Sequence, residues 1–522
     1  KPPCIEDIVA LVALYRPGPM ENIPTYCEVK NGQKKLESIH PSIDHILEET
    51  QGIIVYQEQV MQIAQVMAGY SLGGADLLRR AMGKKIAEEM AKERPKFVKG
   101  AIENGVNEKK AGEVFDLLEK FANYGFNKSH AAAYAVVSYQ TAYLKANYPV
   151  EFMAGVMNCD IHLTEKLAVY KREVDRLNIA VIPPCVNRSR ARFDVKDGAL
   201  VYALGALKNV GVDAMRLLVD GRGDKPFATL FDMARRVDLK RVGKRALEML
   251  ARAGAFDQLD RNRRRVFDSL DGLVTYSAAV HEARASNQVS LFGEAGADIP
   301  EPRMAQGDDW LPTERLAAEH QAIGFYLSGH PLDDYAGALK RKKVLTLAEI
   351  EKQAAGGGIA TRIAGAVSSR QERKSARGNR FAFVQLSDST GLYEVTVFSE
   401  ALEAGRQYLE PGQNVVISVE ATMEADTLKL LARGIQPIDA VVADAGAAGL
   451  RVHVETPDAI GAVANLLARY GKGQARGPLC FCITDPERGQ EYDIDTGQFY
   501  AITPQVKGAV KSLDGVVLVE EM

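Results

Sequence analysis

Apolar runs with strand-like alternation follow one another between residues 359 and 431, and their order restricts what this part of the chain can fold into. They lie at 359–367, 381–386, 392–398, 415–419 and 428–431, with a helical pattern at 399–409 between the third and the fourth. Three strands, a helix and two strands is the order of an OB barrel. We therefore predict an OB-fold domain at 346–440.

The remaining chain is expected to form several further domains, because 522 residues exceed what one hydrophobic core usually serves. Helical patterns broken by proline and glycine dominate 1–190 and 191–275. Low periodicity marks 276–345 as a linker, and 445–522 has a mixed pattern. The predicted fold class is multidomain: a mainly α first half, then the β barrel and a small α/β C-terminal domain.

Charge is distributed unevenly along the chain, whose net charge is −3. Residues 171–265 hold 22 Lys and Arg against 12 Asp and Glu, a net of +10, whereas 266–522 carry a net of −11. A basic block of this kind indicates a local polyanion site. No apolar run approaches the roughly 18 residues of a membrane span, so we expect no membrane partner and a cytoplasmic location.

The cysteines do not predict a metal site. They are Cys4, Cys27, Cys159, Cys185, Cys480 and Cys482. No CxxC pair exists, and neither a second ligand pair nor a histidine is near Cys480 and Cys482 in the sequence. We expect free thiols in a reducing compartment.

Residues 71–85 contain a cluster of cations: Arg79, Arg80, Lys84 and Lys85. Arg80 and Lys84 are four residues apart, where like charges repel on a helix unless an anion compensates. A triphosphate is such an anion, since arginine offers forked donors and lysine a point charge. The alternative is a solvated face on which Lys84 and Lys85 pair with glutamates four residues on. Both interpretations stay open.

Residues 125–130 place polar and cationic groups, Asn127, Lys128 and His130, at the start of a helix of small residues. They could contribute to an anion pocket. The simpler interpretation is that Asn127 or Ser129 caps that helix.

Four strings resemble the fingers of C-family DNA polymerases, the family of the bacterial DNA polymerase III alpha subunit. They are 13–19, 56–61, 78–85 and 125–130. The resemblance implies that 1–190 are polymerase fingers closing on a deoxynucleoside triphosphate (dNTP). Arg79 and Arg80 would grip its phosphates with support from Lys84 and Lys85, and Asn127, Lys128 and His130 would shape the same pocket.

The resemblance also implies where the catalysis lies. In this family three palm aspartates hold two Mg²⁺ ions for phosphoryl transfer, upstream of the string at 13–19. We expect no catalytic residue in this chain, Mg²⁺ bound by the palm of the intact protein, and no primer extension by residues 1–522 alone. The pair Asp493 and Asp495 is not a substitute.

Residues 191–275 resemble the tandem helix-hairpin-helix region of these polymerases. A glycine turn with Lys208, Asn209 and Gly211, and a looser second unit with Lys244 and Arg245, coincide with the basic block. Backbone N–H groups at such turns suit phosphates. We expect salt-sensitive binding of the primer-template duplex without sequence preference.

The predicted linker contains Gln288, Leu291 and Phe292, an apolar pair that suggests docking into a groove. The spacing resembles the family's peptide for the beta sliding clamp. By the same resemblance, the tail domain at 445–522 would bind the clamp-loader tau subunit.

Basic residues gather between the first two barrel strands: Arg370, Arg373, Lys374, Arg377 and Arg380. A basic loop there, with rings such as Phe381, Phe383 or Tyr393 for stacking, predicts binding of single-stranded DNA.

Three alternative functions stay open. The chain could belong to an error-prone paralogue of the same family, although such paralogues usually end near the barrel. It could be a non-catalytic scaffold tethered to the clamp. It could be a plain single-strand binder, which leaves 71–130 unexplained.

Overall fold

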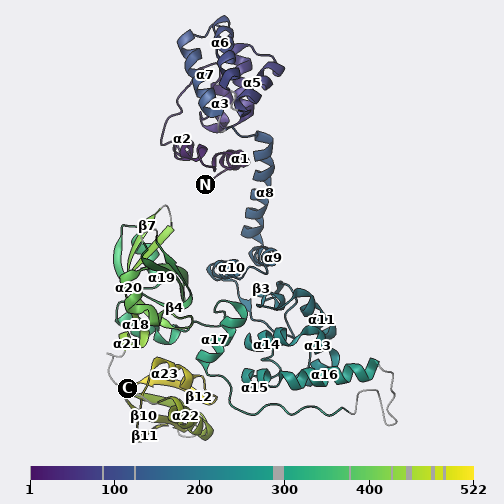
Figure 1. Cartoon of the computed structure of the whole chain (residues 1–522), viewed down its shortest axis with the longest axis vertical. Coiled ribbons are helices and arrows are strands. Elements are labelled where there is room, and N and C mark those ends of the chain that lie inside the picture. Colours follow the sequence, from purple (N-terminus) through teal and green to yellow (C-terminus); the bar gives the residue numbers. More distant parts are fainter. Residues whose placement is uncertain are drawn as a thin grey trace. The chain divides into compact units, whose positions relative to one another are not determined.

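A computed structural model of the chain describes residues 2–84, 87–122, 125–285, 299–375, 378–424, 427–442, 449–471, 477–485 and 490–522. The chain divides into two compact units, Lys1–Phe152 and Met153–Met522. Figure 1 shows the first as helical and the second as a mixture of helices and sheets.

The first unit is built from helices separated by short turns. They are α1 (Ile5–Leu14), α2 (Ile23–Lys30), α3 (Asp44–Leu47), α4 (Gln57–Ala68), α5 (Leu72–Lys84), α6 (Ala87–Glu103), α7 (Glu108–Ala122) and α8 (Lys128–Asn147). The start of α4 is secured by Gln59, whose side-chain oxygen accepts from the backbone N–H groups of Val55 and Tyr56 at 2.8 and 2.9 Å. The end of α4 turns at Gly69, with φ 67°, where a residue without Cβ is favoured.

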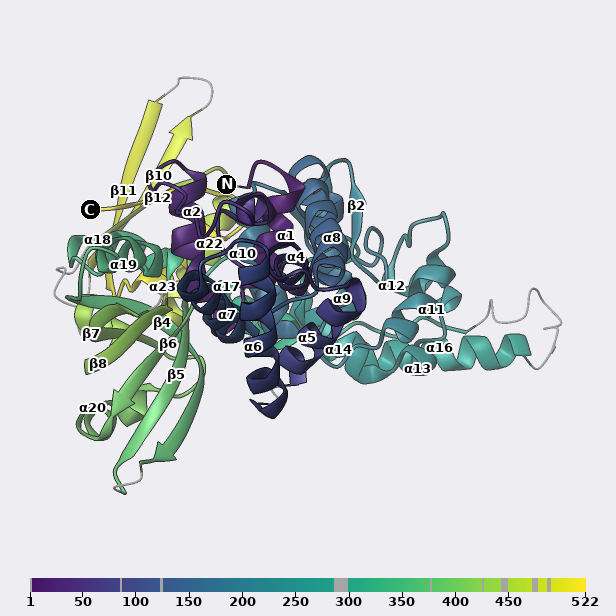
Figure 2. The same cartoon turned by 90° about the horizontal axis from the view of Figure 1, so that it is seen from above.

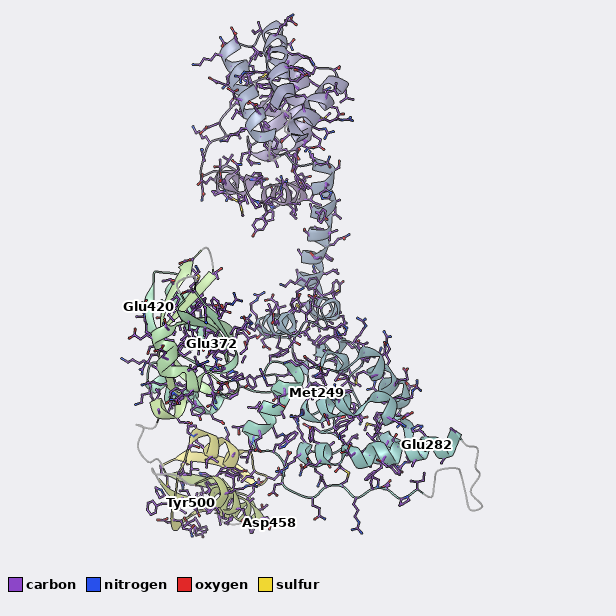
Figure 3. All side chains as sticks on the ribbon, viewed as in Figure 1. Met249, Glu282, Glu372, Glu420, Asp458 and Tyr500 are labelled. Carbon is purple, nitrogen blue, oxygen red and sulfur yellow. The ribbon has the colours of Figure 1, made fainter. Side chains whose placement is uncertain are left out.

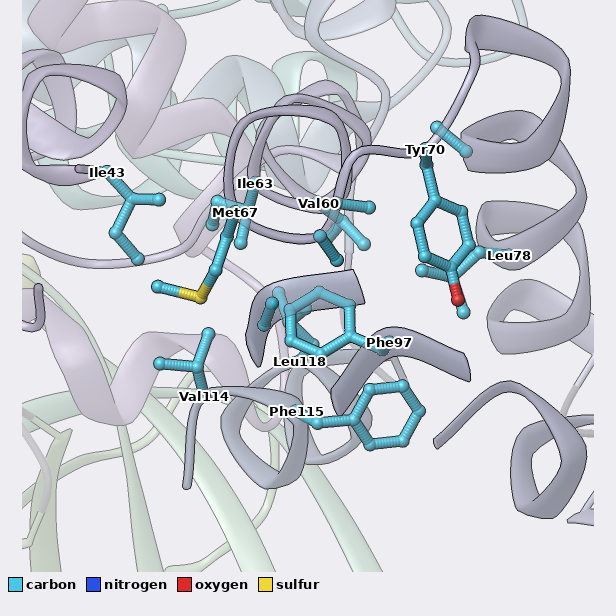
Figure 4. Close-up of a cluster of buried hydrophobic side chains, with 14 of the residues drawn as sticks. Ile43, Val60, Ile63, Met67, Tyr70, Leu78, Phe97, Val114, Phe115 and Leu118 are labelled. Atoms are coloured by element: carbon cyan, nitrogen blue, oxygen red, sulfur yellow. The ribbon is translucent and has the colours of Figure 1, made fainter. Parts of the chain in front are cut away.

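The core of this unit lies between α4, α5, α6 and α7 (Figure 4). Val60, Ile63 and Met67 lie on one face of α4 because their spacing of three and four residues matches the helical repeat. They pack with Phe97 of α6 and Phe115 of α7, whose rings are 5.4 Å apart between centroids. This core fixes the first turn of α4 relative to α5.

The second unit begins with helices around a small sheet. The helices are α9 (Pro149–Cys159, which starts in the first unit), α10 (Thr164–Arg176), α11 (Val212–Arg222), α12 (Leu230–Arg236), α13 (Leu239–Val242), α14 (Lys244–Arg252), α15 (Arg263–Asp268), α16 (Leu270–Ala285), α17 (Pro312–Ile323), α18 (Ala336–Arg341) and α19 (Leu347–Ala354). The sheet has the order β1 (Val181–Ile182), β3 (Ala199–Val201), β2 (Asp194–Lys196). The segment expected as a linker, 276–345, thus includes the end of α16 and all of α17 and α18.

A closed barrel follows, with the strand order β4-β5-β6-β8-β7. Its elements are β4 (Ile359–Lys374), β5 (Arg380–Asp388), β6 (Gly391–Phe398), α20 (Ser399–Gly405), β7 (Asn414–Glu424) and β8 (Thr427–Pro437). β4 pairs with both β5 and β7, and β6 pairs in parallel with β8, which closes the barrel. The predicted order of three strands, a helix and two strands is confirmed.

One detail of that prediction is wrong. Arg370, Arg373 and Lys374 lie in β4, and Arg380 begins β5, so they do not form a loop. The alternation of β4 continues well past 367 because Arg373 and Lys374 still pair in register with Phe381 and Arg380. Polar residues on the outer side of a strand weaken the apolar signal without ending the strand.

The C-terminal domain is α/β, as predicted, and follows α21 (Ile438–Val442). Its sheet has the order β11-β10-β9-β12, formed by β9 (Leu450–Val454), β10 (Gly477–Asp485), β11 (Gln490–Tyr500) and β12 (Val516–Glu521). Helices α22 (Pro457–Tyr470) and α23 (Pro504–Lys511) pack with one face through Val452, Leu467 and Val510. Figure 2 shows β10 and β11 as a long paired ribbon.

Within the described residues, no helix combines the length and apolarity that crossing a bilayer requires. The division of the chain into five functional segments stays a prediction.

Candidate functional site

Gln57, the first residue of α4, joins three of the sequence strings in space. Its side-chain oxygen accepts a hydrogen bond from Arg79 Nη1 at 3.2 Å, and its amide donates to the Gly125 carbonyl at 3.1 Å. Its backbone N–H donates to the Phe126 carbonyl. Residues 56–61, 78–85 and 125–130 are therefore neighbours. The string at 56–61 was part of the family resemblance, but Gln57 itself was not predicted as a site residue. Its uncharged amide does not stand out in a sequence as a charged side chain does.

Arg79 and Arg80 share one carboxylate, that of Asp76. Arg79 donates from Nε and Nη2 to Asp76 Oδ1 at 2.9 and 2.8 Å, and Arg80 Nε lies 2.9 Å from Asp76 Oδ2. The hydrogen bonds from Arg79 hold the pKa of Asp76 below its ordinary value. Asp76 is thus an anion within the protein that both arginines share, and neither interpretation of the sequence named it. Its place three and four residues before the arginines was the signal that could have revealed it.

The two guanidiniums differ in accessibility. The side chain of Arg79 is 31% exposed and packs against Gln57, whereas that of Arg80 is 62% exposed and reaches only Asp76 among the hydrogen-bond and ion-pair partners in the described residues. One carboxylate between two arginines leaves one positive charge. We call Gln57, Asp76, Arg79 and Arg80, with residues 125–128, the Gln57 cluster.

Asn127 caps α8, as the simpler interpretation predicted. Its side-chain oxygen accepts from the backbone N–H of His130 at 2.8 Å, and its amide donates to Glu58 at 2.9 Å. Lys128 Nζ lies 2.6 Å from a carboxylate oxygen of Glu49. The side chains of Asn127 and Lys128 thus have protein partners in this conformation.

The first string, 13–19, also reaches this cluster. The Arg16 guanidinium lies over the Phe126 ring at 4.4 Å from its centroid, and Phe126 contacts the exposed His130 edge to face. All four strings of the resemblance therefore meet around the start of α4 and the start of α8.

Some predicted site residues lie outside what the structure describes. They are Lys85, Gln288, Leu291, Phe292 and Arg377, together with the side chain of Lys84 at the end of α5. Their assignments stay predictions.

The first hairpin turn precedes α11. Gly211 is the exposed N-cap of this helix, and Asn209 is also exposed, with a left-handed φ of 59°. The backbone N–H of Lys208 donates to the Ala322 carbonyl at 2.7 Å. The turn therefore offers a phosphate the N–H groups at the start of α11, but not that of Lys208.

The second hairpin unit joins α13 and α14 through Gly243, whose φ of 91° requires a residue without Cβ. Lys244 lies 2.7 Å from Asp271, which raises the pKa of Lys244 through their hydrogen bond. Arg245 is exposed and has no hydrogen bond or ion pair with a described residue. Arg245 is therefore the more available cation of the two.

The outer side of β5 and β6 carries exposed and half-buried rings next to a cation of β4, and we define the aromatic face as Phe381, Phe383, Phe398 and Arg373. Phe381 contacts Phe383 and Phe398 with centroids 5.4 and 6.2 Å apart, and Phe398 is 52% exposed. Arg373 lies over Phe383 at 5.5 Å from the ring centroid. These rings alternate with core residues such as Ala382 and so point out of the barrel.

Tyr393 and Arg370 do not belong to this face. Tyr393 is a core ring whose hydroxyl donates to the Ala364 carbonyl at 2.8 Å, and burial raises its pKa. Arg370 pairs with Glu372 and Glu410 at 3.4 and 2.9 Å; Figure 3 labels Glu372 on the barrel. Phe398, which sequence reasoning missed, takes the place of Tyr393.

Two family profiles match parts of the chain. The bacterial DNA polymerase III alpha subunit finger domain matches residues 1–105, and the helix-hairpin-helix motif matches residues 178–266. The barrel has weak structural likenesses to the second OB-fold domain of replication protein A from Methanococcus maripaludis. That match has 17% identity and a TM-score of 0.13, and covers 16% of this chain and 85% of that one. The barrel assignment rests on its own strand order.

Curated relatives match most of the chain. The DNA polymerase III subunit alpha of Caulobacter vibrioides is 47% identical over 522 residues, which cover 99% of this chain and 45% of the relative. Those of Thermus aquaticus and Escherichia coli K12 are 44% and 40% identical, covering 85% and 84% of this chain and 36% and 39% of the relatives. The chain spans less than half the length of these relatives. It belongs to the bacterial DNA polymerase III alpha subunit family.

Proposed function

We propose that this chain is the nucleotide- and DNA-holding part of a template-directed DNA polymerase. The observation that carries the proposal is the Gln57 cluster, where four strings distant in sequence converge beside two arginines that share one carboxylate. The family membership supplies the reaction, which is addition of a deoxynucleotide to a primer 3′ end.

The arginines suit a triphosphate for two reasons. Arg80 is mostly exposed and keeps its outer donors available, and Arg79 is oriented by Gln57 before any ligand arrives. A phosphate oxygen forms stronger hydrogen bonds with a guanidinium than a neutral acceptor does. The triphosphate would therefore share the guanidiniums with Asp76, and the excess positive charge favours this.

The metal chemistry of the reaction is assigned to no residue of this chain. Asp493 and Asp495 were not expected to substitute for the palm aspartates, and their contacts in the structure can be compared with that expectation. Asp493 pairs with Arg451 at 2.8 Å, and Asp495 accepts the backbone N–H of Gly497 at 2.9 Å. Both carboxylates thus have protein partners on the C-terminal sheet, and this pair does not fit a two-metal centre. That residues 1–522 alone extend no primer, and that Mg²⁺ is held elsewhere in the intact protein, stay predictions.

The DNA-binding roles divide between two regions of the second unit. The N-termini of α11 and α14, with Arg245, suit the phosphates of a duplex. The aromatic face suits single-stranded DNA, because the outer side of the second and third strands of an OB barrel is a common nucleic-acid surface.

The clamp and tau partners rest on the sequence resemblance. Substituting Leu291 and Phe292 by alanine should abolish binding of the beta sliding clamp and leave DNA binding unchanged. Unchanged clamp affinity would reject that peptide.

The polymerase proposal is tested by Arg80→Ala in the intact polymerase that contains this chain. Loss of a charge-assisted hydrogen bond of about 1.5–3 kcal/mol predicts that the KM for dNTP rises about 10- to 100-fold. Arg94→Ala is the matched control, since Arg94 is also an exposed arginine on a helix and pairs with Asp116 on α7. An R80A enzyme with the KM of the wild type would contradict the proposal.

A further inference from the structure

The face of the C-terminal sheet opposite its helices gathers metal-binding side chains. His453 alternates with the core residues Val452 and Val454 in β9, and Cys482 follows the core residue Phe481 in β10. His453 and Cys482 therefore point to the same side, away from the helices. Neither residue has a role in the proposed polymerase function.

Strand register brings these residues side by side. Cys482 pairs directly with His453 across the parallel strands β9 and β10, and with Asp493 across the antiparallel strands β10 and β11. Glu491 lies two residues before Asp493 and so on the same face. The ligand atoms of His453, Cys482 and Glu491 all lie within 4.8 Å of one another.

We propose that His453, Cys482 and Glu491 bind one divalent transition-metal ion of the zinc class. An imidazole nitrogen, a thiolate sulfur and a carboxylate oxygen form a mixed donor set that zinc accepts, with a water as the fourth ligand. Calcium and magnesium are excluded as the preferred ion because they take oxygen ligands. The ion would brace three strands of the sheet.

The three ligand atoms need to move only a short distance to coordinate one ion. Bond lengths of about 2.0–2.3 Å to nitrogen, oxygen and sulfur place ligand atoms of a tetrahedral zinc roughly 3.5 Å apart. The three atoms must therefore approach by about 1 Å from their largest separation. Glu491 can supply this, because its side chain is 54% exposed, whereas His453 and Cys482 are held by the sheet.

The local charge also favours a dication. Arg451 lies on this face, with its guanidinium 2.8 Å from Asp493, 3.8 Å from Glu491 and 3.7 Å from Glu520. Three carboxylates around one arginine leave two negative charges. Since Arg451 Nη2 also lies 3.8 Å from Cys482 Sγ, the competing possibility is that Arg451 alone serves as the counter-ion of the face.

Cobalt and zinc titrations of the 522-residue chain separate these possibilities. The exposed thiols of Cys4, Cys27 and Cys159 are first replaced by serine to remove background binding. Co²⁺ is then followed by its thiolate charge-transfer absorption, and Zn²⁺ by competition with a chelating dye. We expect one ion per chain.

The thiol ligand is identified by comparing Cys482→Ser with Cys480→Ser. Both cysteines are buried on the same face of β10, so the second is a matched control for the first. We expect C482S to lose the charge-transfer band and C480S to keep it. Equal bands in C482S and the parent, or loss of the band in C480S alone, would overturn the assignment.

Glu491→Gln is a second variant that is expected to keep the fold, because an exposed side chain can be changed without disturbing the sheet. It is expected to weaken Zn²⁺ affinity at least as much as loss of a group that orients a ligand, which costs about tenfold or more, while circular dichroism stays that of the parent. His453→Gln should weaken it similarly. Wild-type affinity in E491Q and H453Q, or absence of stoichiometric binding in the parent, rejects the site and leaves Arg451 as the counter-ion. Either result leaves the polymerase proposal untouched.

Discussion

The cations of the Gln57 cluster and those of the aromatic face of the barrel have different kinds of partner. In the cluster, Arg79 and Arg80 are bound to Asp76, and Lys128 is bound to Glu49. On the barrel, Arg373 lies over the ring of Phe383. A ligand of the cluster must compete with carboxylates of the protein, whereas bases reaching the barrel meet the exposed ring of Phe398 beside the half-buried rings of Phe381 and Phe383. The first region is organised by hydrogen bonds and the second by apolar surface.

The largest expected effect concerns the aromatic face. Base stacking on an aromatic ring contributes about 1–3 kcal/mol per base, so the double variant Phe381→Ala with Phe383→Ala should bind single-stranded DNA about 100-fold more weakly. Fluorescence anisotropy of a labelled oligothymidine measures this. Phe499→Ala, which removes an exposed ring from the C-terminal sheet, is the control. If the double variant and F499A lost the same amount of affinity for single-stranded DNA, the aromatic face would not be the binding surface and the comparison would fail.

A smaller effect is expected at Gln57. Gln57→Ala removes the acceptor of Arg79 and the donor to Gly125, at a cost of about 1–2 kcal/mol in local stability. Amide hydrogen exchange should report faster opening at residues 125–128 and at the start of α4. Gln62→Ala, an exposed change on the same helix, should alter neither. If Q57A leaves exchange at these residues as it was, hydrogen bonds do not organise the cluster.

The smallest effect is a pH dependence in α5. Because its hydrogen bonds with Arg79 hold the pKa of Asp76 below 3.8, the carboxylate stabilises the folded helix above that pH. The contribution disappears as the pH falls through the lowered pKa. Hydrogen exchange in α5, corrected for intrinsic rates, should therefore differ between wild type and Asp76→Asn at neutral pH and converge in acid. A difference that persists unchanged in strong acid would assign the stabilisation to something other than the carboxylate charge.

Local signals in the sequence were sufficient for some of the elements and for the family. The period of Val60, Ile63 and Met67 predicts α4, and the order of the apolar runs predicts the barrel, because both depend on neighbours a few residues apart. The strings around Arg79 and Asn127 carry the resemblance that the relatives confirm. The cap at Asn127 was likewise readable, since capping is a contact over three residues.

Tertiary structure alone decided which of these residues meet. Gln57 and Gly125 are far apart in the chain, and only the packing of α4 near the start of α8 makes them partners. Both sides of the barrel carry aromatic rings, and the structure separates the exposed Phe398 from Tyr393, whose hydroxyl donates to the Ala364 carbonyl in the core. His453 becomes a neighbour of Cys482 through the register of two parallel strands, which no spacing in the sequence encodes. The physical reason is the same in each case: local propensity sets the elements, while burial of their apolar faces sets which surfaces come together.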